Sequence, residues 1–272
     1  MATRWLMPVA PPSCGSARLA ESYRLEPRLR HAVRVPPAPL ELRPDRSIYR
    51  IDGGWFRARW HFSFDQYSDP RNMGIGKMRV FNHDTLVPGA VWPMHPHRNI
   101  EGITLVVAGE FEHADSLGND GVLRPGGVQR MRLGSGAEHS ERNHSKTTEM
   151  QFIQIWILPD RPNLPPDVVQ KQYTERDRTD RLLRCLKPDA AEGEGLGVAQ
   201  DVTMFVSRLT AGKGVAQELG RGRGGYLYLI SGAMSANGSA MTTGDAAYIR
   251  GSGSLEIAAR DTSELLLVDT PL

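Results

Sequence analysis

The chain has 272 residues, of which 40% are hydrophobic and 24% charged, a composition that excludes a wholly disordered protein. No apolar run approaches the roughly 18 residues that a membrane-spanning helix needs, so we expect no membrane protein. Net charge is only +2, and eight arginines lie within residues 1–47, which leaves the remainder slightly acidic and argues against direct nucleic-acid binding.

Glycine and proline are frequent, with 28 and 19 residues, which favours short strands joined by turns over long helices. Residues 1–47 hold eight of the prolines without a sustained apolar period, so we expect a disordered or extended arm there. Strands are expected over residues 48–160, as in ITLVVAGEFEH and EMQFIQIWIL, where short apolar runs alternate with turns. The charged, proline-bounded residues 161–174 are expected to form a linker.

The second half of the chain repeats the first in outline. VVAGEFEHAD matches LISGAMSANG, LRPGGVQRMR matches MTTGDAAYIR, and GSGAEHSER matches GSGSLEIAA. Each half is therefore expected to be a small β-barrel or sandwich with a ligand cavity in its mouth. The prediction is an all-β chain with two tandem domains, residues 48–160 and 175–272.

Cysteine usage and the N-terminal residues bear on the cellular compartment. The two cysteines, Cys14 and Cys185, lie far apart and form no metal-ligand spacing. The first residues lack the apolar core of a secretion signal. We therefore expect a cytoplasmic protein in a reducing compartment.

The strongest chemical signal is the segment GAVWPMHPHRNIE, in which His95 and His97 are two residues apart. Residues i and i+2 of a strand point to the same face, so both imidazoles can reach one ion. His139 and Glu141 repeat this spacing on a later predicted strand. If the two pairs face each other inside the first domain, three nitrogens and one carboxylate surround a divalent transition metal and leave coordination positions open.

Other side chains near these ligands are candidates for supporting roles. His113 could lie beneath the ligands, although ordinary hydrogen bonding in the core is the commoner role of such a histidine. Four side chains are candidates for lining an aromatic-binding pocket, with plain core packing as the alternative: Phe81, Trp92, Met94 and Trp156.

The spacing G-x5-HxH-x3-E, formed by Gly89, His95, His97 and Glu101, resembles the first motif of the cupin superfamily. The segments WPMHPHR, GEFEHADSLGN, RPGGVQRM and GAEHSE resemble the pirin family, particularly its bacterial members described as quercetinases. This resemblance covers about residues 50–272 and implies a bicupin, two tandem cupin β-barrel or jelly-roll domains, with one metal in the first.

The resemblance also implies roles for individual residues. The metal ligands would be His95, His97, His139 and Glu141. Glu101 corresponds to a ligand of many cupins, but in the pirin arrangement it is expected to support the site by hydrogen bonding. In the second domain, alignment of the GSG turns places Glu256 and Ala258 opposite His139 and Glu141, so that domain is expected to hold no metal and to shape the cavity.

The expected function follows from the ligands and the resemblance together. It is a metal-dependent dioxygenase, a candidate quercetin 2,3-dioxygenase that cleaves a flavonol-like aromatic with O2, with Glu141 as the catalytic general base. Fe2+ is the expected cation, although the same donors accept Mn, Ni, Cu or Zn. The alternative is a non-enzymatic, iron-binding redox sensor that binds a protein partner, as other pirins are described.

Overall fold

The computed structural model describes residues 35–272, so most of the expected arm, residues 1–34, lies outside the described residues. The regular structure of the described residues is almost entirely strand, as predicted. Its helices are one short α-helix, α1 (Glu175–Arg178), and one 3-10 turn, η1 (Asp45–Ser47). Neither is long and apolar enough to cross a membrane.

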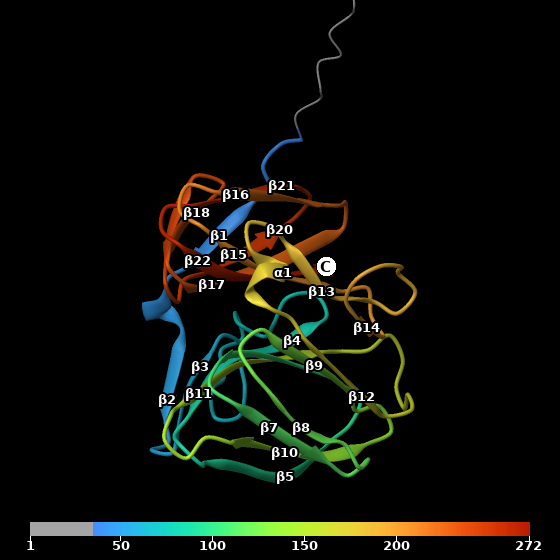
Figure 1. Ribbon diagram of the computed structural model, residues 1–272. Helices are drawn as coiled ribbons and strands as arrows, with labels where there is room; N and C mark the ends of the chain where they lie inside the picture. Colours follow the sequence, from blue (N-terminus) through green and yellow to red (C-terminus); the bar gives the residue numbers. More distant parts are fainter. Residues whose placement is uncertain (1–34) are drawn as a thin grey trace, which may run out of the picture. The chain divides into compact units, whose positions relative to one another are not determined.

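The N-terminal half consists of a seven-stranded antiparallel sheet, in the order β12-β9-β6-β11-β4-β3-β2, and a four-stranded sheet, in the order β5-β10-β7-β8 (Figure 1). Its strands are β2 (Tyr49–Asp52), β3 (Phe56–Trp60), β4 (Met78–Leu86), β5 (Val91–His97), β6 (Glu101–Ala108), β7 (Phe111–Asp115), β8 (Asp120–Leu123), β9 (Gly127–Arg132), β10 (Ala137–Asn143), β11 (Met150–Ile157) and β12 (Asp167–Gln172).

The C-terminal half has the same plan, with sheets in the orders β1-β20-β17-β22-β15-β13-β14 and β16-β21-β18-β19. The order β16-β21-β18-β19 repeats β5-β10-β7-β8 strand for strand, which confirms the predicted tandem repeat. Its strands are β1 (Leu40–Arg43), β13 (Leu183–Pro188), β14 (Leu196–Val198), β15 (Thr203–Leu209), β16 (Gly214–Leu219), β17 (Arg223–Ser231), β18 (Ala233–Ala236), β19 (Ser239–Thr242), β20 (Ala246–Arg250), β21 (Gly253–Ala259) and β22 (Ser263–Pro271).

Two expected boundaries need correction. Residues 40–43, expected in the arm, form β1 and pair with β20, and the Arg43 side chain is buried. Residues 167–172, expected in the linker, form β12 and pair with β9. Both strands lie at a sheet edge. β1 spans only four residues, too few for a clear strand pattern, and β12 lacks the apolar alternation by which a strand is predicted.

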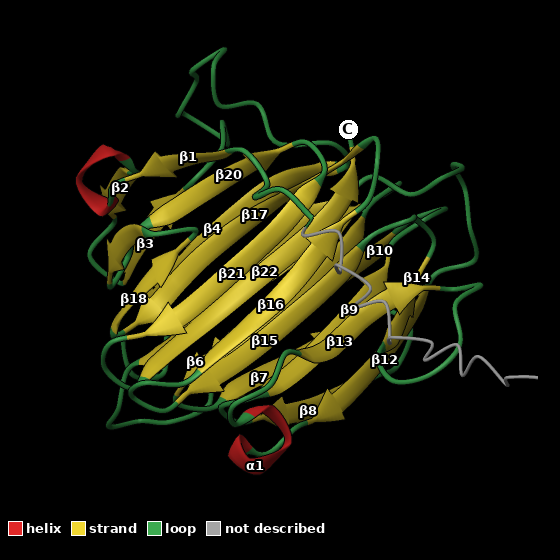
Figure 2. Cartoon of the chain, turned by 90° about the horizontal axis from the view of Figure 1, so that it is seen from above, coloured by secondary structure: helices red, strands yellow, loops and turns green. Residues whose placement is uncertain are grey.

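The two seven-stranded sheets pack against each other and share a hydrophobic core. One cluster of buried residues contains Phe81 and Ile155 from the N-terminal half and Tyr226, Tyr248 and Leu266 from the C-terminal half. Seen from above, the strands of the stacked sheets run in roughly the same direction (Figure 2), as in aligned sheet packing. The seven-stranded sheet of the N-terminal half therefore has one face toward the C-terminal half and the other toward its own four-stranded sheet.

Candidate metal centre

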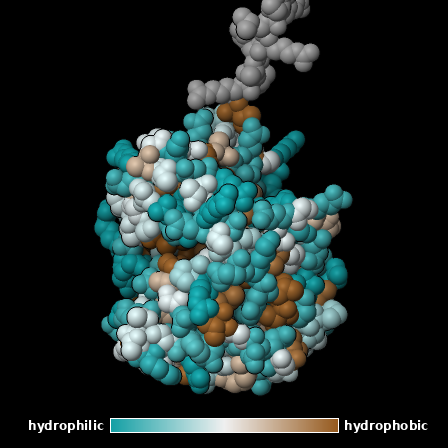
Figure 3. Space-filling view, in the orientation of Figure 1, coloured by the Kyte–Doolittle hydropathy of each residue, from teal (hydrophilic) through white to brown (hydrophobic). Residues whose placement is uncertain are grey.

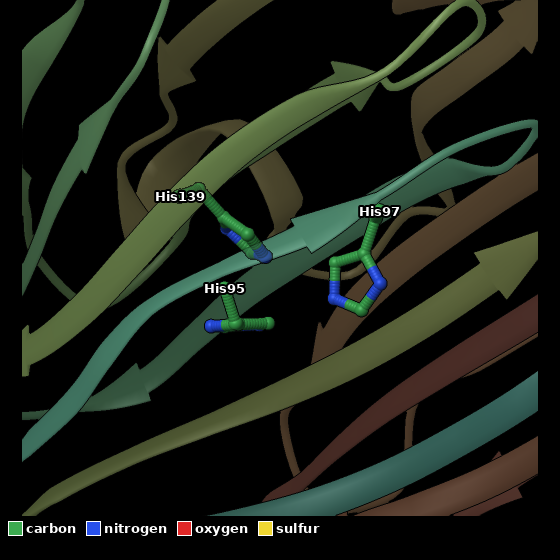
Figure 4. Close-up of side chains that lie close together, drawn as sticks. All are labelled: His95, His97 and His139. Atoms are coloured by element: carbon green, nitrogen blue, oxygen red, sulfur yellow. The ribbon is translucent and has the colours of Figure 1, made fainter.

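Three histidines meet between the sheets of the N-terminal half. Strands β5 and β10 pair antiparallel with His95 directly opposite His139, and His97 lies two residues farther along β5. One ligand nitrogen from each ring lies within 4.8 Å of the others. The ring centroids of His95 and His139 are 4.5 Å apart (Figure 4). Among residues 35–272 this is the one such group of three or more potential ligand side chains.

The hydrogen bonding of these histidines fits a divalent metal. Both ring nitrogens of the buried His139 lack a hydrogen-bond partner, an arrangement that costs free energy unless something binds there. His95 Nδ1 lies 2.8 Å from the carbonyl oxygen of Pro93, and donation to that oxygen leaves Nε2 free to coordinate.

The electrostatics of the site also suit a cation. Burial, assisted by the neighbouring imidazoles, lowers the pKa of His139 to about 2, and burial and His95 lower that of His97 to about 4. Both rings are therefore neutral at pH 7, which is the form that binds metal.

Glu141 lies beside the histidines on the same strand. Its Oε1 is 3.9 Å from His139 Nδ1, and its side chain lines the same cavity. Burial raises its pKa to about 7. The structure thus brings three of the four expected ligands into one compact group and places the fourth next to them.

The cavity has a volume of about 130 Å³ and opens between the two sheets of the N-terminal half. Trp156 forms part of its wall, with its ring centroid 4.7 Å from that of His97. Alternate residues of β4 and β11 point into it from the seven-stranded sheet. The lining residues are Trp60, Phe64, Asn82, Asp84, Trp92, His95, His97, His139, Glu141, Phe152, Gln154 and Trp156.

A β-bulge in β5 decides which of the pocket candidates line the cavity. His139 and Glu141, two residues apart on β10, pair with His95 and Trp92, which are three apart on β5. The additional residue lets both Trp92 and His95 face the cavity, while Met94 is 48% exposed and does not line it. Without the bulge, strict alternation would place Trp92 and Met94 on the same face of β5. Because the bulge breaks this alternation, the expectation that Met94 lines the cavity is wrong.

Phe81 and Glu101 do not line the metal cavity either. Phe81 is fully buried and packs against His61, Tyr226 and Tyr228 at the junction of the two halves. Glu101 was expected to support the metal site. Its carboxylate instead accepts hydrogen bonds from Arg132 Nε (2.8 Å) and from the backbone N–H of Ala199 (3.1 Å), so it links the halves.

His113 lies next to two of the expected ligands, on the neighbouring strand β7. It is the direct partner of Glu141 in the β7–β10 ladder, and its ring centroid is 5.9 Å from that of His139. Its Nε2 lies 3.1 Å from the sulfur of Met131, and no hydrogen bond to a metal-site histidine is formed.

Sequence reasoning missed several cavity residues, chiefly Asn82 and Asp84 on β4. Two polar residues at i and i+2 in an otherwise buried strand are the signal that could have identified them, because a buried polar face needs a function or a partner. Asp84 is 6% exposed, and burial together with the charge of Glu141 raises its pKa well above the ordinary value.

The chain matches two family models that correspond to the two halves. The Pirin model matches residues 41–157, and the model described as the quercetinase C-terminal cupin domain matches residues 186–270. A pirin-like protein from Caulobacter vibrioides is 35% identical over 230 residues, which cover 85% of this chain and 99% of the relative. The protein belongs to the pirin family. Both halves are thus cupin domains, as expected from the motifs.

Further relatives of this pirin come from Escherichia coli. A quercetin 2,3-dioxygenase from strain K12 is 34% identical over 219 residues, covering 80% of this chain and 93% of the relative. The crystal structure of the bacterial pirin YhhW in complex with nickel(II) has a TM-score of 0.80 and 31% identity, covering 86% of this chain and 99% of that one.

The C-terminal cupin domain has apolar residues where the first has the expected ligands His139 and Glu141. Leu255 and Ile257 occupy the positions of His139 and Glu141. Ile257 pairs with Ala236 of β18 as Glu141 pairs with His113 of β7, and Leu255 pairs with Gln217 of β16 as His139 pairs with His95 of β5. Both are buried in an apolar core. The expected equivalence with Glu256 and Ala258 is therefore wrong by one residue, which moves every side chain to the opposite face.

Proposed function

We propose that this pirin is a metal-dependent dioxygenase that cleaves a flavonol-like aromatic with O2. The observation that carries the proposal is the group of His95, His97 and His139 at an aromatic-lined cavity, in which His139 is buried and both of its ring nitrogens lack a partner. The relative named as a quercetin 2,3-dioxygenase supports this class of substrate.

The three histidines would hold a divalent transition metal, with Glu141 as the fourth ligand. Fe2+ is our proposed cation, and nickel(II) is the ion bound in YhhW. A metal with open positions supplies Lewis acidity toward the substrate oxygens and the redox chemistry that O2 requires.

The aromatic walls of the cavity would bind and orient the substrate. Trp92, Trp156 and Phe152 present ring faces and edges that suit a flat aromatic and exclude water from the reacting end. The cavity, about 130 Å³, is smaller than the roughly 300–1,000 Å³ usual for a ligand site, so only the hydroxy-keto end of a flavonol would enter it. The rest of the molecule would extend through the opening.

Two carboxyl groups could accept the hydroxyl proton of the substrate. Glu141 is the proposed general base, since a group with a pKa near the working pH serves this role best. Asp84 lines the same cavity and is the second candidate.

The test is oxygen-dependent turnover by defined metal forms. Chelated protein is reloaded with Fe2+, Mn2+, Ni2+, Cu2+ or Zn2+, mixed anaerobically with quercetin and then exposed to O2. We expect at least one metal form to consume O2 in proportion to the loss of the flavonol absorbance. This turnover should be absent in His139→Ala and retained in the control Met94→Ser. Glu141→Gln and Asp84→Asn distinguish the two bases, because only loss of the true base removes the acid limb of the pH profile. No turnover with any metal, despite stoichiometric iron binding, would reject the proposal in favour of the non-enzymatic alternative.

A further inference from the structure

A second concave site lies on the opposite side of the sheet that carries the cavity. It is a cleft of about 540 Å³ between the two halves, and the surface in Figure 3 is hollowed at the level of this junction. The cleft is lined by residues of β2, β3, β4 and β11 and by two residues of the C-terminal half: Arg50, Ile51, Asp52, Arg57, Ala58, Arg59, His83, Thr85, Gln151, Ile230 and Thr243.

Strand alternation places this cleft back to back with the metal centre. On β4, Asn82 and Asp84 line the metal cavity, whereas His83 and Thr85 line the cleft. In the β3–β4 ladder Arg59 pairs with His83, and Arg57 pairs with Thr85. In the β2–β3 ladder Arg50 pairs with Arg59, so three arginines are neighbours on one face.

These arginines retain hydrogen-bond donors that point to no protein acceptor. Arg57 uses only Nη2 to bind the two carboxylate oxygens of Glu149, at 2.8 and 2.9 Å. Within residues 35–272, its Nε and Nη1 make no hydrogen bond. Asp45 interacts with Arg50 Nη2 and lies 3.1 Å from Arg59 Nε. Arg59 also forms a hydrogen bond with the side chain of Tyr228. Asp45 and Glu149 therefore neutralise only part of the positive charge of the three arginines, and they leave Nε and Nη1 of Arg57 free.

Two other residues that line the cleft, His83 and Asp52, would also affect the binding of an anion. His83 is 5% exposed, its Nδ1 is 2.7 Å from the hydroxyl of Tyr228, and its buried Nε2, next to the amide of Gln151, lacks a well-formed hydrogen bond. If Tyr228 donates to Nδ1, Nε2 carries a hydrogen available to a ligand. The carboxylate of Asp52 accepts from the N–H of Gly54 at 2.9 Å, within its own turn.

We propose that this cleft binds a small molecule bearing an oxyanion, a carboxylate or a phosphate, through the free N–H groups of Arg57 and its neighbours and the imidazole of His83. Guanidinium groups match the geometry of both oxyanions. Because β4 contributes to both sites, the bound anion would contact the strand that positions Asn82 and Asp84. The site does not depend on the proposed dioxygenase activity, since none of its residues belongs to the metal centre.

The test is calorimetric titration of the full chain at low ionic strength with inorganic phosphate and, separately, succinate. We expect saturable binding at one site, weakened at least tenfold by Arg57→Gln and less by Arg57→Lys. Glu149→Gln should strengthen binding, because it frees the guanidinium of Arg57. Arg221→Gln, an exposed arginine in the turn before β17, is the matched control and should bind as the wild type does. The preferred probe distinguishes a phosphate from a carboxylate ligand.

Three results would overturn the proposal: no saturable binding of either probe, equal weakening by Arg57→Gln and Arg221→Gln, or no change in Glu149→Gln. Arg57 is half-exposed, so the substitution should leave the fold intact, and a circular dichroism melt verifies this.

Discussion

Replacing Glu101 by alanine should loosen the junction between the two halves without weakening metal binding. The carboxylate is fully buried and accepts hydrogen bonds from Arg132 and Ala199. Breaking a buried ion pair costs about 3–5 kcal/mol. Arg132 would keep Asp189 at 2.7 Å, and Arg130 would keep Asp167, so the loss should lie at the lower end. We expect about 3 kcal/mol, or a fall in Tm of roughly 6–12 °C for a chain of this size.

The assay is urea unfolding of chelated protein, paired with metal titration of the folded variant. Glu110→Ala is the control, since Glu110 forms an exposed ion pair with Arg124 at 3.0 Å and its loss should cost less than about 1 kcal/mol. If Glu101→Ala unfolds at the wild-type urea concentration but binds metal tenfold more weakly, Glu101 supports the metal site and our assignment to the junction is refuted.

Three further predictions test the site and the register. Burial raises the pKa of Glu141 from 4.5 to about 7. In chelated protein, the free energy of unfolding of the wild type relative to Glu141→Gln should therefore be highest below about pH 4.5 and should fall by about 3 kcal/mol as the pH rises through 7. Urea unfolding of both proteins between about pH 5 and pH 8 measures it, and a constant difference would contradict the burial of this carboxyl group. Ile257→Ala should destabilise the protein by about 2–4 kcal/mol, because it leaves a cavity in the apolar core, whereas the adjacent, exposed Ala258→Ser should change the stability by less than about 0.5 kcal/mol. Met94→Ser should change neither the metal affinity, measured by titration, nor the Tm, measured by thermal unfolding. A change in metal affinity would mean that Met94 faces the cavity.

The sequence was most informative where two short-range patterns coincided. His95 and His97, and again His139 and Glu141, combine residue types that bind metals with the period of a strand, so both their identity and their common face could be predicted. The internal repeat likewise predicted two domains because each half repeats the same turns. Neither prediction needed knowledge of which strands pair.

Features that depend on strand pairing could not be predicted. The bulge opposite His139 and Glu141 is visible only when β5 is set beside β10, and it reverses the direction expected for Met94. The same limit explains the error of one residue at Glu256, since a match between turns fixes the loop but not the ladder. Glu101 was assigned from a motif, whereas its partners Arg132 and Ala199 are distant in sequence.

The contrast between the two cupin domains points to where the metal-free protein should open first. The C-terminal domain has a continuous apolar core that includes Leu255 and Ile257, whereas the equivalent positions of the N-terminal domain hold His139 and Glu141. A buried polar group without a partner costs about 1–3 kcal/mol, so β5 and β10 should be the least stable strands once the metal is removed.

Hydrogen exchange can measure this opening directly. In chelated protein the amides of β5 and β10 should exchange faster than those of β16 and β21, their counterparts in the same topology. A metal that binds only the folded histidine group should slow exchange in β5 and β10 by the factor that its concentration and affinity predict. Equal exchange in both domains, with or without metal, would mean that the unpartnered nitrogens of His139 do not weaken the N-terminal domain.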